Sequence, residues 1–170
     1  VPARSIAELI ALARSKPGSL VAGSAGLGTS PHLSQELFNS MAGIDVVHVP
    51  YKGSGQSIVA LLGAEVVISY PSILTAIPHV RSGRLRALGV TTRTRAEAMP
   101  GVPAIAEALP GYEATQWFGV LAPAGTPRPI VETLHREIVR ALRAPEVKER
   151  LAGEGAEVIA GTPAEFSDRK

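Results

Sequence analysis

One stretch of the chain, residues 23–33, reads GSAGLGTSPHL and lies between two apolar runs. A strand that ends in small residues just before a helix directs free backbone amides, and the positive end of the helix dipole, toward one point. Gly26 and Gly28 allow a ligand to approach the backbone closely. The hydroxyl donors of this glycine loop would be Ser24, Thr29 and Ser30. The loop therefore predicts an anion site.

The type of anion follows from what the loop lacks. The lysine of a phosphate-binding P-loop is missing after Gly28, and Pro31 stands where the third glycine of a dinucleotide-binding loop belongs. A polyphosphate would need a lysine or a metal-binding acid nearby, whereas a carboxylate needs only amides and hydroxyls. We expect an organic acid; a turn that serves chain reversal and capping alone is the alternative.

The histidines allow fewer conclusions. His32, in the first turn after the loop, could face the anion or make a hydrogen bond at the start of the helix. His48 on a strand and His79 on a helix are expected to make structural hydrogen bonds, and His135 to be solvated. The sequence has no cysteine and no HExxH spacing, so we predict no metal site. Lys52 could steer anions or be an ordinary solvated lysine.

Catalytic patterns are missing as well. There is no G-x-S-x-G turn, no Ser–His–acid set can be nominated, and the acidic residues stand mostly on helix faces. We therefore predict that the chain is not an enzyme and that it needs no cofactor.

Composition narrows the class of protein. The chain has 170 residues, enough for one domain or slightly more, and 45% of them are hydrophobic. Its 17 basic and 15 acidic residues give a net charge of +2, and aromatic residues make up 4%. Nucleic-acid binders usually carry a basic stripe with interleaved aromatics, which this sequence lacks. No run reaches the ~18 uninterrupted apolar residues of a membrane span.

The elements that must position the glycine loop alternate along the chain. Apolar runs predict strands at 19–23, 44–50, 65–69 and 85–92. Helices are expected after a capping box that begins at Ser5, after Ser30, after 51–55 and over 72–81. This order predicts an α/β fold with a mostly parallel sheet. The buried face of the second helix is expected to consist of Leu33, Leu37, Phe38 and Met41.

The remainder of the chain is predicted to be different. A short helix is expected within 99–111 and an extended segment over 112–127. Two helices should follow, one capped by Thr126 and Pro127, and one that runs from Pro145 to Gly153. Thr162 begins a second capping box.

Taken together, these stretches resemble the periplasmic solute-binding proteins of tripartite tricarboxylate transporters, the TctC-like or Bug receptors. The resemblance rests on GSAGLGTSPHLSQELFNSMAGIDVVHVPYKGSGQSIVALLGAEV, IPHVRSGRLRALGVTT, MPGVPAIAEALPGYEATQWFGVLAPAGTP and LAGEGAEVIAGTPAEF. It extends over nearly the whole chain in the order and spacing of the family.

The resemblance implies a periplasmic-binding-protein-like (type II) fold of two α/β lobes with the ligand between them. Residues 1–115 would be the second, ligand-binding lobe, and residues 116–170 would return to the first lobe, whose N-terminal part and export signal would be missing. It also implies a periplasmic receptor, a monomer at full length, that delivers a small tricarboxylate, dicarboxylate or similar acid to a membrane permease.

By the same resemblance, the ligand contacts would come from Ser24, Ala25, Gly26, Gly28, Thr29, His32 and Ser72. After the third strand many relatives carry an acidic residue and then Asn, whereas this chain has Pro71 and Ser72. In those relatives the acidic side chain could bind an amine or hydroxyl group of the ligand. We expect no such contact in this chain, because Pro71 cannot make it.

Two other functions remain open from the sequence. The chain could be a phospho-ligand- or nucleotide-dependent α/β enzyme that uses the glycine loop to hold phosphate. Alternatively, half a cleft could bind nothing without the opposing lobe, which supplies much of the ligand's burial.

Overall fold

The computed structural model describes residues 1–153 and 156–168, and the chain divides into two compact units, Val1–Gln116 and Trp117–Lys170. The boundary expected from the sequence lay between residues 115 and 116. The two units are described separately below. None of the helices within the described ranges is both long and apolar enough to cross a membrane.

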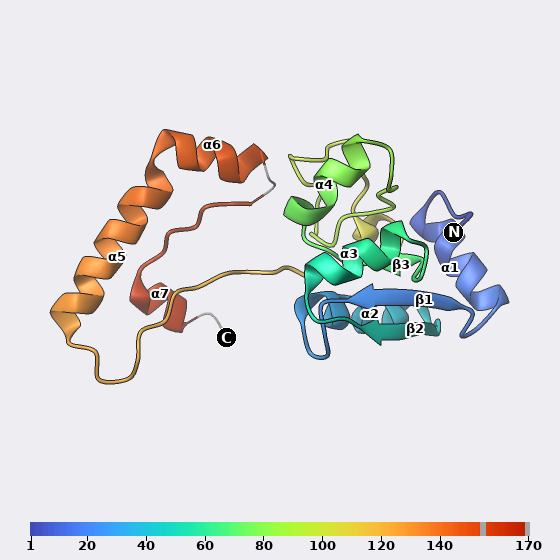
Figure 1. Ribbon diagram of the computed structural model, residues 1–170, viewed down its shortest axis with the longest axis horizontal. Coiled ribbons are helices and arrows are strands. Elements are labelled where there is room, and N and C mark those ends of the chain that lie inside the picture. The colour runs from blue at the N-terminus through green and yellow to red at the C-terminus, as the bar shows by residue number, and fades with distance from the viewer. Residues whose placement is uncertain (154–155, 169–170) are drawn as a thin grey trace. The chain divides into compact units, whose positions relative to one another are not determined.

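A three-stranded parallel sheet forms the centre of unit 1 (Figure 1). The strand β1 (Leu20–Ser24) lies between β2 (Val46–Pro50) and β3 (Ile68–Ser69). In the register, Ala22 of β1 pairs with His48 on one side and with Ile68 on the other. Because the strands are parallel, their carboxyl ends meet at one edge of the sheet.

Helices follow each strand of unit 1. These are α2 (Ser30–Ala42), α3 (Ser54–Leu62) and α4 (Ile73–Arg81), while α1 (Ile6–Ser15) precedes the sheet and the short 3-10 helix η1 (Ile105–Glu107) comes later. Successive residues of a strand point to opposite faces. Ser24 contacts His48, whose ring stacks on His32 of α2, whereas a side chain at Gly23 would point toward Ser57 of α3. Helices α2 and α3 therefore cover opposite faces of β1.

The first helix begins with Ser5 as its N-cap, as predicted, but the Glu8 side chain reaches back to the amide of Arg4 and not to that of Ser5. The Ser5 hydroxyl accepts a hydrogen bond from the Glu8 amide at 3.1 Å, and the Glu8 carboxylate accepts one from the Arg4 amide at 2.7 Å. These bonds satisfy amides that have no partner within the helix. The apolar side of α1 is buried in a cluster that it shares with β1, α2 and Tyr112; its own buried residues are Ile6, Leu9 and Ala13.

The predicted buried face of α2 is wrong except at Phe38. Leu33, Leu37 and Met41 are exposed, and the residues that face the protein interior are Ser34, Gln35, Phe38 and Ala42. Polar side chains determine which side of α2 is buried, because the side-chain amides of Gln35 and Asn39 both donate to the backbone carbonyl of Val46 in β2. These bonds fix the rotation of the helix about its axis in a way that its apolar spacing did not reveal.

Two predicted strands are shortened or absent. The third strand is limited to Ile68–Ser69 instead of 65–69, and the predicted strand at 85–92 is wrong, because Val90 alone forms a parallel bridge, to Ala104. Pro71, which has no N–H, follows β3 at once and cannot donate to a neighbouring strand. The short β3 therefore offers little edge for a fourth strand to pair with.

Unit 2 is helical after an extended segment. It contains α5 (Arg128–Arg143), α6 (Pro145–Gly153) and α7 (Pro163–Ser167). The Thr162 capping box forms as predicted, but Thr126 does not cap α5, because its hydroxyl donates to the Pro123 carbonyl at 2.8 Å. The Phe166 ring stands edge-on to Trp117.

Candidate functional site

The glycine loop connects β1 to α2 as the sequence predicted. Helix α2 begins at Ser30 with Thr29 as its N-cap, one residue earlier than expected, and Pro31 occupies the second helical position. Gly26 and Gly28 have φ angles of 136° and 72°, in a region that side chains disfavour. The loop therefore needs glycine at these two positions for its backbone shape.

The hydroxyls of the loop are turned toward the loop's own backbone. Thr29 Oγ1 donates to the Gly26 carbonyl at 2.7 Å, and the Gly26 amide donates to Ser24 Oγ at 3.1 Å. Ser24 is 1% exposed. These hydroxyls hold the shape of the loop in this structure instead of pointing to solvent.

Two histidines contact the loop. His48 Nε2 lies 2.6 Å from Ser24 Oγ, and the Gly28 amide donates to His32 Nδ1 at 3.0 Å. The two imidazole rings stack with their centroids 4.0 Å apart and their planes 21° from parallel. Glu36 Oε1 lies 3.8 Å from His32 Nε2, one turn along α2.

Electrostatics favours a neutral ring at His48. Burial lowers the pKa of His48 below its ordinary value of 6.5, the neighbouring His32 lowers it further, and Glu36 partly offsets both effects. The proton of a neutral imidazole occupies only one of the two nitrogens, so each ring can accept a hydrogen bond at the other.

A small, shallow hollow lies at the edge where the strands end. Its lining residues come from the loop, from the starts of α2 and α3, and from the segment after β3; they are Ala25, Pro31, Ser54, Ser57, Ser69 and Pro71. None of these six carries a charged side chain. The hollow is too tight to enclose even a water molecule, unlike a typical small-molecule site of ~300–1,000 Å³, so a ligand group could bind only at its mouth.

Free amides are available at this edge. The first amides of a helix have no intrahelical partner. Within residues 1–153 and 156–168, no hydrogen bond is recorded for the amides of Ala25, Ser30 and Ser54. Two helix N-termini, of α2 and α3, therefore supply unpaired donors next to the hollow.

The hydroxyls of the lining form a short chain of hydrogen bonds. Ser69 Oγ donates to the Gly23 carbonyl at 2.9 Å, and Ser57 Oγ lies 3.3 Å from Ser69 Oγ. Sequence reasoning missed Ser54, Ser57 and Ser69. A signal was present: in open parallel sheets, ligands bind beyond the carboxyl ends of the strands, and all three serines follow or end predicted strands.

The residues predicted to contact the ligand occupy different places. Ala25 lines the hollow, while Ser24, Gly26, Gly28 and Thr29 form the loop with the bonds given above, and His32 packs against His48. Ser72 caps α4, accepting from the Thr75 amide, and follows Pro71 without itself lining the hollow. Direct contact between these residues and a ligand stays a prediction.

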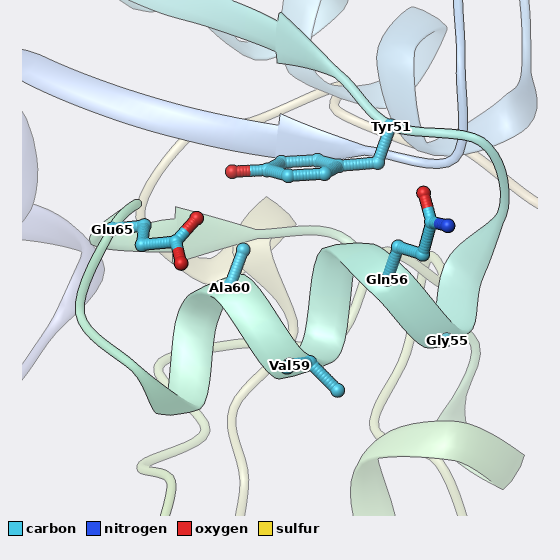
Figure 2. A pocket seen from close by; sticks show the side chains of 6 residues that line it. All are labelled: Tyr51, Gly55, Gln56, Val59, Ala60 and Glu65. Atoms are coloured by element: carbon cyan, nitrogen blue, oxygen red, sulfur yellow. The ribbon is translucent and has the colours of Figure 1, made fainter.

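A larger hollow of about 370 Å³ lies elsewhere, beside α3. Figure 2 shows the Tyr51 ring lying across this helix above Ala60, with its hydroxyl end toward Glu65, while Val59 points away. Glu65 is the one charged residue among those lining it, and its carboxylate would repel an acid. We therefore place the candidate anion site at the smaller hollow.

Metal binding has no support in the described part of the chain. Among residues 1–153 and 156–168, no group of three histidine or acidic side chains is placed to hold an ion.

Comparison with protein families gives a match over nearly the whole chain. The model of the tripartite tricarboxylate transporter family receptor, TctC, matches residues 1–167. Curated relatives include a UPF0065 protein from the tcbD–tcbE intergenic region of Pseudomonas sp. strain P51, 42% identical over 167 residues, and BugT of Bordetella pertussis, 38% identical over 160 residues. The matched segments cover 97% and 94% of this chain but 50% and 49% of those proteins, so the chain spans about half their length.

Solved structures agree with the family match. Rpa4515 of R. palustris with adipate has a TM-score of 0.94 and 38% identity, and the match covers 98% of this chain and 56% of that one. MatC of Rhodopseudomonas palustris with bound malate has a TM-score of 0.85 and 32% identity, covering 96% and 55%. The family consists of substrate-binding receptors and not of enzymes, in agreement with the prediction from the sequence.

Proposed function

Because the chain belongs to the tripartite tricarboxylate transporter receptor family, we propose that unit 1 binds one carboxylate group of a small organic acid at the amino termini of α2 and α3. In the complete receptor, this wall would act with the remaining half of the protein to enclose the acid. The receptor would work in the periplasm and deliver its ligand to a membrane permease.

The observation that carries this proposal is the convergence of two helix N-termini on an uncharged hollow. Helix α2 has 13 residues and α3 has nine, and both begin beside the hollow with unpaired amides. Such amides and the helix dipoles favour a negative group. Since no lysine, arginine or acidic residue lines the hollow, it suits a carboxylate better than a polyphosphate with its metal ion.

The ligands of two related structures narrow the class of acid. Rpa4515 is described with adipate and MatC with malate, and both are aliphatic acids with two carboxylate groups. Because the hollow is too tight to enclose an acid, one carboxylate would bind at its mouth, and other parts of the receptor would enclose the rest of the molecule. We therefore propose an aliphatic dicarboxylate or a similar acid.

The test is a titration of this chain with adipate and malate, followed by amide chemical shifts in NMR spectra. We expect shifts at Ala25, Ser30 and Ser54 with either acid, at millimolar concentrations because only one wall of the site is present. The neutral diamide of adipic acid should cause none. Equal shifts with the diamide, or shifts only with Mg·ATP, would contradict the proposal.

A matched pair of variants tests the role of the α3 amide. Proline at the first helical position removes the N–H without disrupting the helix. Ser54→Pro should weaken adipate binding about tenfold, as expected for the loss of one hydrogen bond to a charged group. Ser54→Ala keeps the N–H and should bind more tightly than Ser54→Pro. Equal affinities of the two variants would exclude this amide as a ligand donor.

A further inference from the structure

The stacked imidazoles of His32 and His48 lie against the glycine loop and are not part of the hollow. We propose that they are positioning residues that hold the loop in its binding shape, and that uptake of a proton by this pair distorts the loop and weakens carboxylate binding. The inference rests on the proposed function of the loop.

The bond between His32 and Gly28 makes the loop sensitive to protonation. Nδ1 of His32 accepts the Gly28 amide at 3.0 Å, which requires an unprotonated Nδ1 and therefore a proton on Nε2. A second proton on the ring would bind to Nδ1 and place two N–H donors against each other. The hydrogen bond would then be lost, and Gly28, whose φ of 72° is set by the loop, would have to move.

The bond between His48 and Ser24 fixes the other end of the loop. Ser24 Oγ lies 2.6 Å from His48 Nε2 and accepts the Gly26 amide at 3.1 Å. Since the hydroxyl is 1% exposed, water cannot replace either partner. The position of the His48 ring therefore determines where the Ser24 oxygen holds Gly26.

Stacking couples the two rings. With centroids 4.0 Å apart, two imidazolium rings would repel each other, so a positive charge on His32 opposes protonation of His48. The charged group that faces them is Glu36, at 3.8 Å from His32 Nε2. Tyr70 and Tyr112, on the segments that pack against α2, stay neutral because burial raises the pKa of both hydroxyls.

Two effects of the proton on an anionic ligand oppose each other. A positive ring would attract a carboxylate, but the nearby Glu36 carboxylate offsets much of that charge. The loss of the Gly28 bond acts directly on the backbone that forms the site. We therefore expect the distortion of the loop to prevail, so that affinity falls in acid.

The first test needs no ligand. The Gly28 amide of the 170-residue chain is followed by NMR as the pH is lowered from about 8 to 5.5, across the range in which histidines titrate. We expect its chemical shift to titrate and its hydrogen exchange to speed up. In His32→Asn, the side-chain oxygen can accept at a similar place without titrating, so the Gly28 amide should lose this response. A Gly28 amide that ignores pH in the wild type would overturn the proposal.

The second test measures binding of adipate over the same pH range. In the wild type the affinity should fall by about tenfold, as expected for the loss of one hydrogen bond that holds the site. In His32→Asn the dependence should flatten, and this variant also corrects for protonation of the ligand itself. His79→Asn removes a histidine of α4 that contacts Arg84 and not the glycine loop, so this variant should keep the wild-type pH dependence.

The outcomes separate the two proposals. Equal pH dependence in His32→Asn and wild type, or tighter wild-type binding in acid, would contradict the role of the histidines. Failure of every acid to bind at any pH would contradict the proposed function, while the ligand-free titration of Gly28 would still decide whether the histidines hold the loop.

Discussion

His48 Nε2 lies 2.6 Å from Ser24 Oγ and connects the middle of β2 to the end of β1 on the face that α2 covers. The two residues are 24 positions apart and are brought together by the parallel register, in which Ala22 pairs with His48 and Ser24 with Pro50. The pairing of β1 with β2 therefore fixes the position of the Ser24 hydroxyl, which accepts a hydrogen bond from the Gly26 amide of the glycine loop.

Removing this hydroxyl should destabilise unit 1. Ser24→Ala leaves the partly buried Gly26 amide and His48 Nε2 without their partner, so we expect a loss of about 1–3 kcal/mol in the free energy of unfolding. Urea unfolding followed by circular dichroism measures it. Ser15→Ala, which removes an exposed hydroxyl bonded to the Leu12 carbonyl, is the control. Equal stability of the two variants would show that the Ser24 bonds are unimportant.

The lowered pKa of His48 predicts how stability depends on pH. Because the pKa is below 6.5 in the folded protein, the unfolded chain binds this proton more readily. The contribution of His48 is therefore fully present above about pH 6.5 and is lost as the pH falls toward the folded value. His48→Gln should reduce this acid sensitivity in unfolding curves measured between about pH 8 and 5. If the unfolding free energy of His48→Gln falls with pH as steeply as that of the wild type, other groups cause the acid sensitivity.

Gly23 is required for packing and not for an unusual backbone angle. A Cβ added there would lie 3.0 Å from Ser57 Oγ, 3.0 Å from Val66 Cγ2 and 3.2 Å from Tyr51 Cε2. Gly23→Ala should therefore cost about 1–3 kcal/mol in unfolding free energy, the usual penalty of overpacking. Gly101→Ala meets nothing within 4 Å and serves as the comparison. A melting temperature as high as that of Gly101→Ala would mean that α3 can shift freely.

Tyr112 fixes the end of unit 1 to α2. Its hydroxyl donates to the Ser34 carbonyl at 2.9 Å, and burial raises its pKa to about 12. Tyr112→Phe should lower the free energy of unfolding by about 0.5–1.5 kcal/mol, as expected for one buried hydrogen bond. Tyr51→Phe offers a control, since no hydrogen bond of the Tyr51 hydroxyl is recorded in the described part of the chain. If Tyr51→Phe lowers the free energy of unfolding as much as Tyr112→Phe does, the hydrogen bond to Ser34 does not stabilise the fold.

Helix α2 shows where apolar spacing is a poor guide. The spacing of its apolar residues predicted one buried face, but Gln35 and Asn39 face the sheet because both donate a hydrogen bond to the Val46 carbonyl. Hydropathy assigns an amide side chain to the surface, and only the position of a neighbouring strand reveals a partner for it. The failed strand at 85–92 has a similar cause, since strand formation needs an edge to pair with, and β3 is two residues long.

The glycine loop, the alternation of strands and helices, and the caps at Ser5 and Thr162 could be read from the sequence, because each depends on neighbours within a few residues. The contacts of the loop with His48 and the approach of Ser54, Ser57 and Ser69 to it could not be read in this way. They depend on strand order and register, which bring residues from separate segments to one edge of the sheet. Local chemistry thus predicted the glycine loop and its place between a strand and a helix, whereas the folded sheet determined which side chains surround it.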